Sequence, residues 1–282
     1  GLIVLAAGLL LSQVYGYYKK HTVHKAQKQG MSQPLWQASG PMDTFPDTIS
    51  RVDAAQQGAV LHNKNTLMPL KRLDTLEIAS IALGTDSLTP FQHALSLYSR
   101  VRHFTIEAGK SKAFQEELSS FLAPTDVLVL FTHASLENRQ ALQRDLDWLP
   151  GLTENLQTIV VHAGMPEILR TLKAGMNPEG VIYLPSAKPV AQQVAAQAVF
   201  GGLPAPGLLP VSLDFRFRAG AGIGPDSQKI RLGYGIPAQE KLGQLNLQAI
   251  DSVIQDGIRK RAMPGVQLLI ARNGRDVHRK AY

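Results

Sequence analysis

The fold is decided by one stretch, "DVLVLFTHASLENRQALQRDLDWLPGLTENLQTIVVHAG", residues 126–164. It opens with a continuous apolar run at 126–133 and closes with a second run at 157–164. Between them, residues 135–149 repeat their apolar side chains at helical spacing. Continuous apolar strands are typical of parallel sheets, whose two faces are both covered by helices. The stretch therefore predicts a β-α-β unit.

The same alternation extends in both directions along the chain. Further strand-like runs lie at 77–84, 100–106 and 180–186. Helical spacing recurs in four more segments, at 89–98, 111–122, 165–173 and 187–200. Because crossover helices alternate with parallel strands and cover both faces of the sheet, we predict an α/β fold with a doubly wound, mostly parallel sheet.

The first 51 residues differ from this pattern. Residues 1–12, "GLIVLAAGLLLS", form an uncharged apolar run that is too short to span a bilayer as a helix. One interpretation is a shortened membrane anchor, whose interfacial flank is the Tyr-rich segment before Lys19 and Lys20. The other is a remnant of a buried element. Residues 29–58 are rich in Pro, Gly, Ser and Gln, and we interpret them as a linker or wrapping segment.

Composition excludes several classes of protein. The chain has no cysteine, which rules out disulfides and thiolate zinc sites. Its apolar fraction of 44% and charged fraction of 18% are those of a globular protein. The net charge is +7, but the basic residues are scattered and form no stripe with aromatic residues. We therefore expect no nucleic-acid partner.

Two histidines are the candidate binding residues. His133 and His162 stand at the ends of two predicted strands, and open α/β sheets bind ligands at the carboxyl ends of their strands. They are candidates for polar contacts to a substrate in the crevice, although a histidine at a strand end is more typical of a structural role in capping or hydrogen bonding. The segment "GTDS" (84–87) lacks the further glycines of a dinucleotide fingerprint, and "AGAGIG" (219–224) precedes no helix. We interpret 219–224 as a flexible connection and expect no nicotinamide cofactor.

Motifs for catalysis are missing from the chain. It contains no Ser-x-x-Lys, no Gly-x-Ser-x-Gly and no His-Glu-x-x-His. The eight histidines are dispersed, which argues against a metal helix. We expect no catalytic residue, cofactor or metal ligand within these residues.

Two phrases carry a family resemblance. The segment 59–84 resembles the opening of the C-terminal domain of glycoside hydrolase family 3, where a helix ends in a Leu-rich phrase. The segment 195–213 is similar to that domain's closing phrase. The matching residues are Leu61, Asn63, Leu67, Pro69 and Leu70, then Phe200, Gly201, Gly207, Leu209, Pro210 and Val211. Gly201 is expected to end a helix and Pro210 to open an edge strand. The resemblance covers residues 52–215.

The resemblance implies a glycosidase whose catalytic centre lies outside this chain. In that family an aspartate on an N-terminal (β/α)8 barrel is the nucleophile, and residues 1–51 are too short for a barrel of about 250 residues. It implies a non-catalytic C-terminal domain of an enzyme that hydrolyses β-linked N-acetylglucosaminides or glucosides. The carbohydrate substrate would be bound through the missing barrel. Bacterial cell-wall turnover would place the protein in the periplasm or cell envelope, with the cytoplasm as the alternative.

The last segment, 245–282, resembles the start of a serine β-lactamase-like or penicillin-binding-protein-like domain. Such domains open with an amphipathic helix, then Pro-Gly, a strand and a tight hairpin. The matching residues are Ile250, Val253, Ile254, Gly257 and Ile258 on the helix, then Pro264, Gly265, Asn273 and Gly274. Asn-Gly favours a type I′ turn, because both residues tolerate positive φ. Residues 216–244 would be the linker, and the acylating Ser-x-x-Lys would lie beyond residue 282.

Two other functions stay open at this point. The chain could be the N-terminal extension of a β-lactamase-like serine hydrolase, or a stand-alone sugar-binding or interaction module. The coding sequence on both sides of the chain separates these hypotheses. In each of them we expect the chain to be inactive by itself.

Overall fold

The computed structural model describes residues 51–282, apart from 136, 172–175, 225–228 and 243. The predictions for residues 1–50, including the membrane anchor, therefore lie outside the described residues. Among the helices of the described part, none combines the length and apolarity that crossing a bilayer requires.

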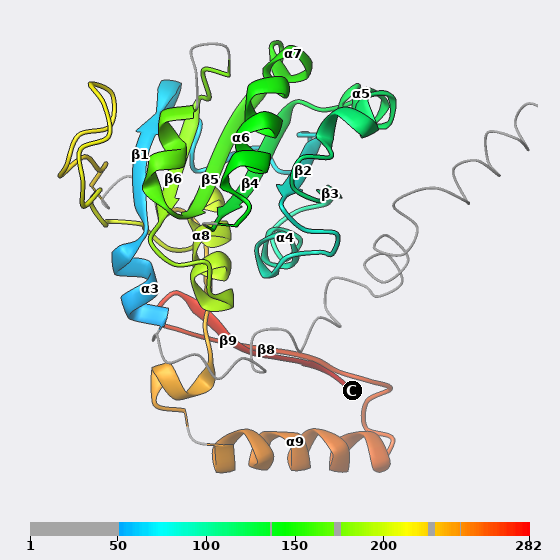
Figure 1. The fold of residues 1–282 in the computed structure, drawn as a ribbon. Helices are drawn as coiled ribbons and strands as arrows, with labels where there is room; N and C mark the ends of the chain where they lie inside the picture. Colours follow the sequence, from blue (N-terminus) through cyan, green and yellow to red (C-terminus); the bar gives the residue numbers. More distant parts are fainter. Residues whose placement is uncertain (1–50, 136, 172–175, 225–228, 243) are drawn as a thin grey trace, which may run out of the picture. The chain divides into compact units, whose positions relative to one another are not determined.

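A six-stranded sheet is the centre of the α/β region (Figure 1). Its spatial order is β1-β6-β5-β4-β2-β3. The strands are β1 (Ala59–Asn63), β2 (Ile78–Leu83), β3 (Val101–Ile106), β4 (Val127–Ala134), β5 (Gln157–Gly164) and β6 (Gly180–Leu184). All neighbours pair in parallel except β1 and β6. The predicted mostly parallel sheet is confirmed, and so is each strand expected from an apolar run.

Helices cover both faces of this sheet, as predicted. On one face α3 (Arg51–Gln57) and α4 (Pro90–Leu95) both pack against α8 (Pro189–Phe200). On the other face α6 (Arg139–Trp148) contacts β4 and the short helices η3 (Ser111–Phe114) and η4 (Pro166–Thr171). The remaining elements there are α5 (Gln115–Leu122) and α7 (Pro150–Thr153).

The main core lies between the sheet and the α4–α8 layer. Phe131 of β4 stacks on Phe91 of α4, with ring centroids 5.0 Å apart. Burying each side chain of this size contributes about 1.5–3 kcal/mol. Helix α8 ends where predicted, because Gly201 takes a left-handed φ of 73° and closes it.

The segment that opens the α/β region differs from the expectation. Residues 59–63 form the antiparallel edge strand β1 where the resemblance implied the end of a helix; the helix, α3, ends before them. Pairing with β6 buries Ala59 and Val60, and this contact with a distant strand overrides the local pattern.

Two expectations for the closing segment were wrong. Pro210 opens no edge strand; the isolated bridge to β1 is made by Pro206 with Ala59. The stretch 219–224 is no free connection, because Ile223 donates its backbone N–H to Val60 at 2.8 Å, and Leu209 donates to Ala221 at 2.9 Å. These backbone groups satisfy one another along the outer side of β1.

A second, three-stranded sheet follows. It has the order β7-β9-β8 and consists of β7 (Gly233–Tyr234), β9 (Arg275–Ala281) and β8 (Gln267–Arg272). Helices η6 (Pro237–Glu240) and α9 (Gln244–Arg259) precede the hairpin. Asn273 and Gly274 have φ values of 50° and 72°, the positive values expected at this turn. Strand β7 lies inside the predicted linker 216–244, whose boundaries stay a prediction.

Candidate functional site

The strand order creates one point where the chain changes direction. From β2 it crosses to β3 on one side, and from β4 it proceeds through β5 to β6 on the other. Ligands of open α/β sheets bind beyond the carboxyl ends of the two strands at such a switch point. Here those ends are followed by residues 84–87 after β2 and by Ser135 after β4.

The first two backbone N–H groups of the loop after β2 are already hydrogen-bonded within the protein. Gly84 and Thr85 donate their N–H groups to the carbonyl of Ile106, at 2.7 and 3.2 Å. The Thr85 hydroxyl bonds with the backbone of Ser87. These contacts fix the loop against the end of β3, so its first two amides are not available to a phosphate group.

His133 is exposed at the carboxyl end of β4. Within the described residues its imidazole has no hydrogen-bond partner, and partial desolvation lowers the pKa of the ring. Its carbonyl accepts the Asn138 side-chain amide at 3.0 Å, and Asn138 in turn accepts from the Ser135 N–H at 2.8 Å. These hydrogen bonds hold the loop in place. The imidazole of His133 faces solvent and is neutral at pH 7.

His162 has a different environment, because it is fully buried. Its Nε2 lies 2.7 Å from the Met165 carbonyl, which can only accept, so Nε2 carries the proton. Its Nδ1, 2.7 Å from the Thr132 hydroxyl, is then the acceptor. Burial lowers the pKa of His162 to about 4. These are the contacts of a structural histidine; that His162 touches a substrate stays a prediction.

The register also separates the two histidines. His162 pairs with Thr132, whereas His133 pairs with Ala163. Since successive side chains along a strand alternate between the faces of a sheet, the two imidazoles point to opposite faces. The structure therefore does not bring them together as one binding pair, although both lie at the predicted edge.

A serine–histidine contact that the sequence did not indicate lies elsewhere. The Ser96 hydroxyl is 2.7 Å from Nε2 of His103 on β3. A hydrolase would need a third group to orient the imidazole through Nδ1. In the described structure, however, Nδ1 of His103 is buried without a hydrogen-bond partner. Burial also lowers the pKa of His103 to about 4, so we assign this pair no nucleophilic role.

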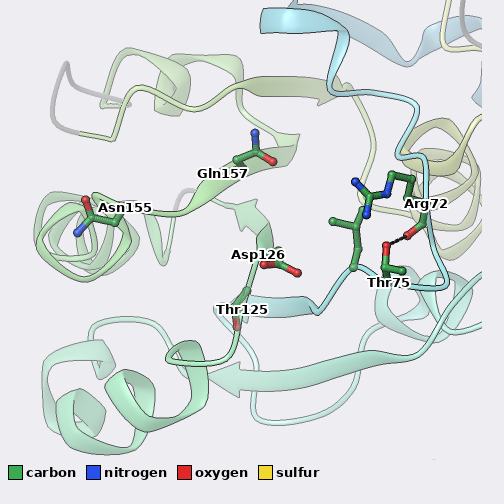
Figure 2. A pocket seen from close by; sticks show the side chains of 7 residues that line it. Arg72, Thr75, Thr125, Asp126, Asn155 and Gln157 are labelled. Atoms are coloured by element: carbon green, nitrogen blue, oxygen red, sulfur yellow. Dashed lines mark hydrogen bonds between the residues drawn. The ribbon is translucent and has the colours of Figure 1, made fainter.

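A polar hollow lies at the opposite, amino edge of the same sheet (Figure 2). It has a volume of about 430 Å³ and is lined by Arg72, Thr75, Leu76, Thr125, Asp126, Asn155 and Gln157. These residues come from the turns that precede β2, β4 and β5 and from the first residue of β5, and no sequence motif links them. Across the described ranges, no three His, Asp or Glu side chains gather closely enough to hold a metal ion.

Comparison with known proteins gives matches among solved structures alone. No family model matches the chain, and no curated protein matches it. One similar structure is a fungal multi-domain GH3 β-N-acetylglucosaminidase with a GCN5-related glucosamine N-acetyltransferase region, at 18% identity and a TM-score of 0.47. That alignment covers 60% of this chain and 19% of the fungal one.

Two further enzymes align over a similar share of the chain. A glycoside hydrolase family 3 β-N-acetylglucosaminidase from Paenibacillus sp. str. FPU-7 is 14% identical, with a TM-score of 0.45, covering 62% of this chain and 35% of that one. The β-glucoside phosphorylase BglX is 13% identical, with a TM-score of 0.43, covering 59% and 31%. The chain therefore spans about a third or less of the length of the proteins that it matches.

Proposed function

We propose that residues 52–215 are the accessory α/β domain of a family 3 glycoside hydrolase acting on β-linked N-acetylglucosaminides or glucosides. The observation that supports this proposal is that several residues of the two resembling phrases, among them Asn63, Leu70 and Gly207, hold defined structural positions.

In the opening phrase, Asn63 organises the turn that leads into the sheet. Its side-chain Oδ1 accepts the Met68 N–H at 2.9 Å, and its Nδ2 donates to the Met68 carbonyl at 2.6 Å. Both backbone hydrogen-bonding groups of Met68 are thus satisfied by one side chain, whose amide can accept and donate at the same time. Leu70, two residues further, is buried in the core.

In the closing phrase, position 207 requires a glycine because the backbone of Gln57 approaches it closely. A Cβ atom at this position would lie 2.6 Å from the Gln57 carbonyl oxygen, so a larger residue would displace the backbone. Leu209 is buried beside it. Arg231 then joins the two phrases, because its guanidinium donates to the carbonyls of Leu70 and Phe200, both at 2.6 Å.

The proposal assigns catalysis to a barrel domain of the same protein and assigns this chain a supporting role. Its carboxyl edge, where His133 is exposed, would face the substrate. We therefore expect the chain alone to turn over neither a chromogenic N-acetyl-β-glucosaminide nor a β-glucoside. Turnover at an enzyme-like rate that a point substitution in this chain abolishes would contradict the proposal.

The positive test uses the whole protein. Its coding sequence upstream of residue 1 should encode a (β/α)8 barrel, and the complete product should hydrolyse chromogenic N-acetyl-β-glucosaminide or β-glucoside. His133→Ala should then lower kcat/KM by about tenfold, the value of a hydrogen bond to substrate. The matched control is His62→Ala, an exposed histidine on β1. Equal rates for both variants would remove His133 from the substrate contact.

A second proposal concerns residues 245–282, which we assign to the start of a β-lactamase-like domain. The order of α9, β8 and β9 and the positive φ values at Asn273 and Gly274 support it. The coding sequence after residue 282 should contain Ser-x-x-Lys, and the complete protein should then hydrolyse a chromogenic cephalosporin. A stop codon directly after residue 282 would contradict this assignment. A location in the periplasm or cell envelope belongs to the same proposal.

A further inference from the structure

The polar hollow at the amino edge of the sheet lies away from the carboxyl edge that the proposed function uses. Its lining begins at the strand ends themselves: Leu76 precedes β2 by two residues, Asp126 directly precedes β4, and Gln157 is the first residue of β5. In the sheet, Ile78 pairs with Val127 and Val127 with Gln157, so these three ends are adjacent. A rigid, hydrogen-bonded ladder therefore sets their spacing.

The polar side chains of Arg72, Asp126, Asn155 and Gln157 at this hollow are exposed, so water satisfies them in the free protein and a ligand would take the place of that water. In the part of the chain that the structure describes, no hydrogen bond or ion pair uses the Arg72 guanidinium or the side-chain amides of Asn155 and Gln157. Asp126 accepts the Glu77 N–H through Oδ2 at 2.9 Å, which leaves Oδ1 available. Figure 2 shows Arg72, Asp126 and Gln157 at this edge of the sheet, with Asn155 further along it and its amide directed away from the other three.

Arg72 is held in an unusual backbone conformation. Its φ is 52°, in the left-handed region that disfavours every residue except glycine and, to a lesser degree, Asn and Asp. Its carbonyl accepts from the N–H of Thr75 at 3.1 Å, from the N–H of Leu76 at 3.2 Å and from the Thr75 hydroxyl at 3.3 Å. These bonds offset the strain and fix the turn from which the guanidinium projects.

The chemistry of the lining defines the ligand. The charges of Arg72 and Asp126 cancel, so the site favours neither a phosphate nor a metal cation. It offers guanidinium donors, a carboxylate acceptor and the Gln157 amide, which both donates and accepts. Hydroxyl groups also both donate and accept, and several of them on one ring would satisfy this set. A volume of about 430 Å³ is at the small end for ligand pockets.

From this combination we propose that the amino-edge hollow binds a neutral, polyhydroxylated ring of monosaccharide size. Arg72, Asp126 and Gln157 hold its hydroxyls, and Leu76 supplies an apolar contact to the ring. This site is separate from the carboxyl edge. It can therefore be present whether or not the chain belongs to a glycosidase.

The test is a nuclear magnetic resonance titration of the ¹⁵N-labelled full chain with N-acetylglucosamine, glucose, sodium phosphate and glycine. We expect saturable shifts of the backbone amides of residues 72–76, 126 and 155–157 with the two sugars. Saturable shifts with phosphate or glycine, but with neither sugar, would mean that the site binds another class of ligand and would overturn the proposal. Shifts confined to the amides around His133, or none with either sugar, would overturn the site.

Variants then test the residues. Arg72→Gly removes the guanidinium and suits a φ of 52°, so the turn should be retained while the affinity for the sugar falls about tenfold or more. Gln157→Ala keeps its place in the backbone ladder and should weaken binding less. Asn65→Gly is the matched control, because Asn65 also has a positive φ, of 54°, and is exposed outside the hollow. Equal affinity in Arg72→Gly and Asn65→Gly would contradict the proposal.

Discussion

Strands β4 and β8 are both hydrogen-bonded in a sheet, β4 in parallel with two neighbours and β8 antiparallel with one, but their surroundings differ greatly. Every side chain of β4 is buried except that of His133. Along β8, exposed side chains alternate with half-buried ones, and none is buried. The first strand lies between two neighbours and two helix layers, whereas the second forms the edge of a three-stranded sheet. The comparison shows that backbone pairing makes a strand, while burial determines its contribution to stability.

The two sheets contact each other through a small cluster of side chains around β7. Tyr98 stacks on Phe200 at 5.0 Å and meets Tyr234 edge to face at 5.1 Å. On its other side, the Tyr234 ring is covered by the Arg279 guanidinium at 5.2 Å. Gln197 of α8 accepts the Tyr234 N–H at 2.7 Å and donates to the Tyr234 carbonyl at 3.2 Å. A side chain of α8 thus occupies hydrogen-bonding positions on β7 that a strand would otherwise take.

The largest effect is expected in the buried strand. Leu130→Ala should lower the free energy of unfolding by about 2–5 kcal/mol, because it leaves a cavity at a side chain with no solvent exposure. Urea unfolding followed by circular dichroism measures the loss. A loss below about 1 kcal/mol would mean that burial is not what distinguishes β4.

Acid should act on the α/β region through two histidines whose pKa burial lowers, His103 and His162. The pKa of His162 is about 4 in the folded state, against 6.5 when exposed. Between these values the unfolded chain binds a proton that the folded chain does not, so stability falls as the pH falls from 6.5 to 4. The contribution of one such group is about 3 kcal/mol over that window.

Urea unfolding at several pH values checks this expectation. His162→Gln should flatten the pH dependence by that share, whatever its effect on stability at pH 7. The exposed His62→Gln on β1 is the control and should leave the slope unchanged. An identical slope in the wild type and in His162→Gln would show that His162 does not remain neutral.

The contact between the two sheets should be intermediate in strength. Gln197→Ala leaves the N–H and carbonyl of Tyr234 without their partner and should cost about 1–3 kcal/mol. Limited proteolysis should then cleave faster within residues 235–262. The exposed Gln248→Ala on α9 is the matched control. Unchanged proteolysis would mean that the aromatic contacts of Tyr98 hold β7 by themselves.

The smallest effect is expected at the edge strand. Leu269 of β8 is 51% exposed, so Leu269→Ala should change the free energy of unfolding by less than about 0.5 kcal/mol. Measured beside Leu130→Ala under the same conditions, it removes the same atoms from the other strand. A cost comparable with that of Leu130→Ala would reveal a surface that covers β8 in solution.

Much of the fold was predictable because the strands of a parallel sheet are apolar on both faces. The runs at 126–133 and 157–164 need no partner information to be recognised. Strand β1 was missed because only its pairing with β6 distinguishes "AVLHN" from other short segments. Strand β7 has two residues, too few for any periodicity, and its place depends on Gln197.

The candidate sites were predictable to a smaller degree. The sequence placed His133 and His162 at the correct edge, but only the register shows that they point to opposite faces. The amino-edge hollow escaped because Arg72, Asp126 and Asn155 come from separate turns and meet only when the strands align. A positive φ at Arg72 is invisible in a sequence, since arginine is not a residue that favours it.

The antiparallel edge strand also constrains how the protein is made. During synthesis the chain leaves the ribosome with its N-terminus first, at about 5–20 residues per second. Of the strands in the described residues, β1 therefore emerges first, yet its partner β6 is the last strand of that sheet to appear. Until β6 follows, the backbone donors and acceptors of β1 have no permanent partner. During synthesis, a chaperone or a neighbouring nascent chain would compete for this segment, and slow translation would lengthen the competition.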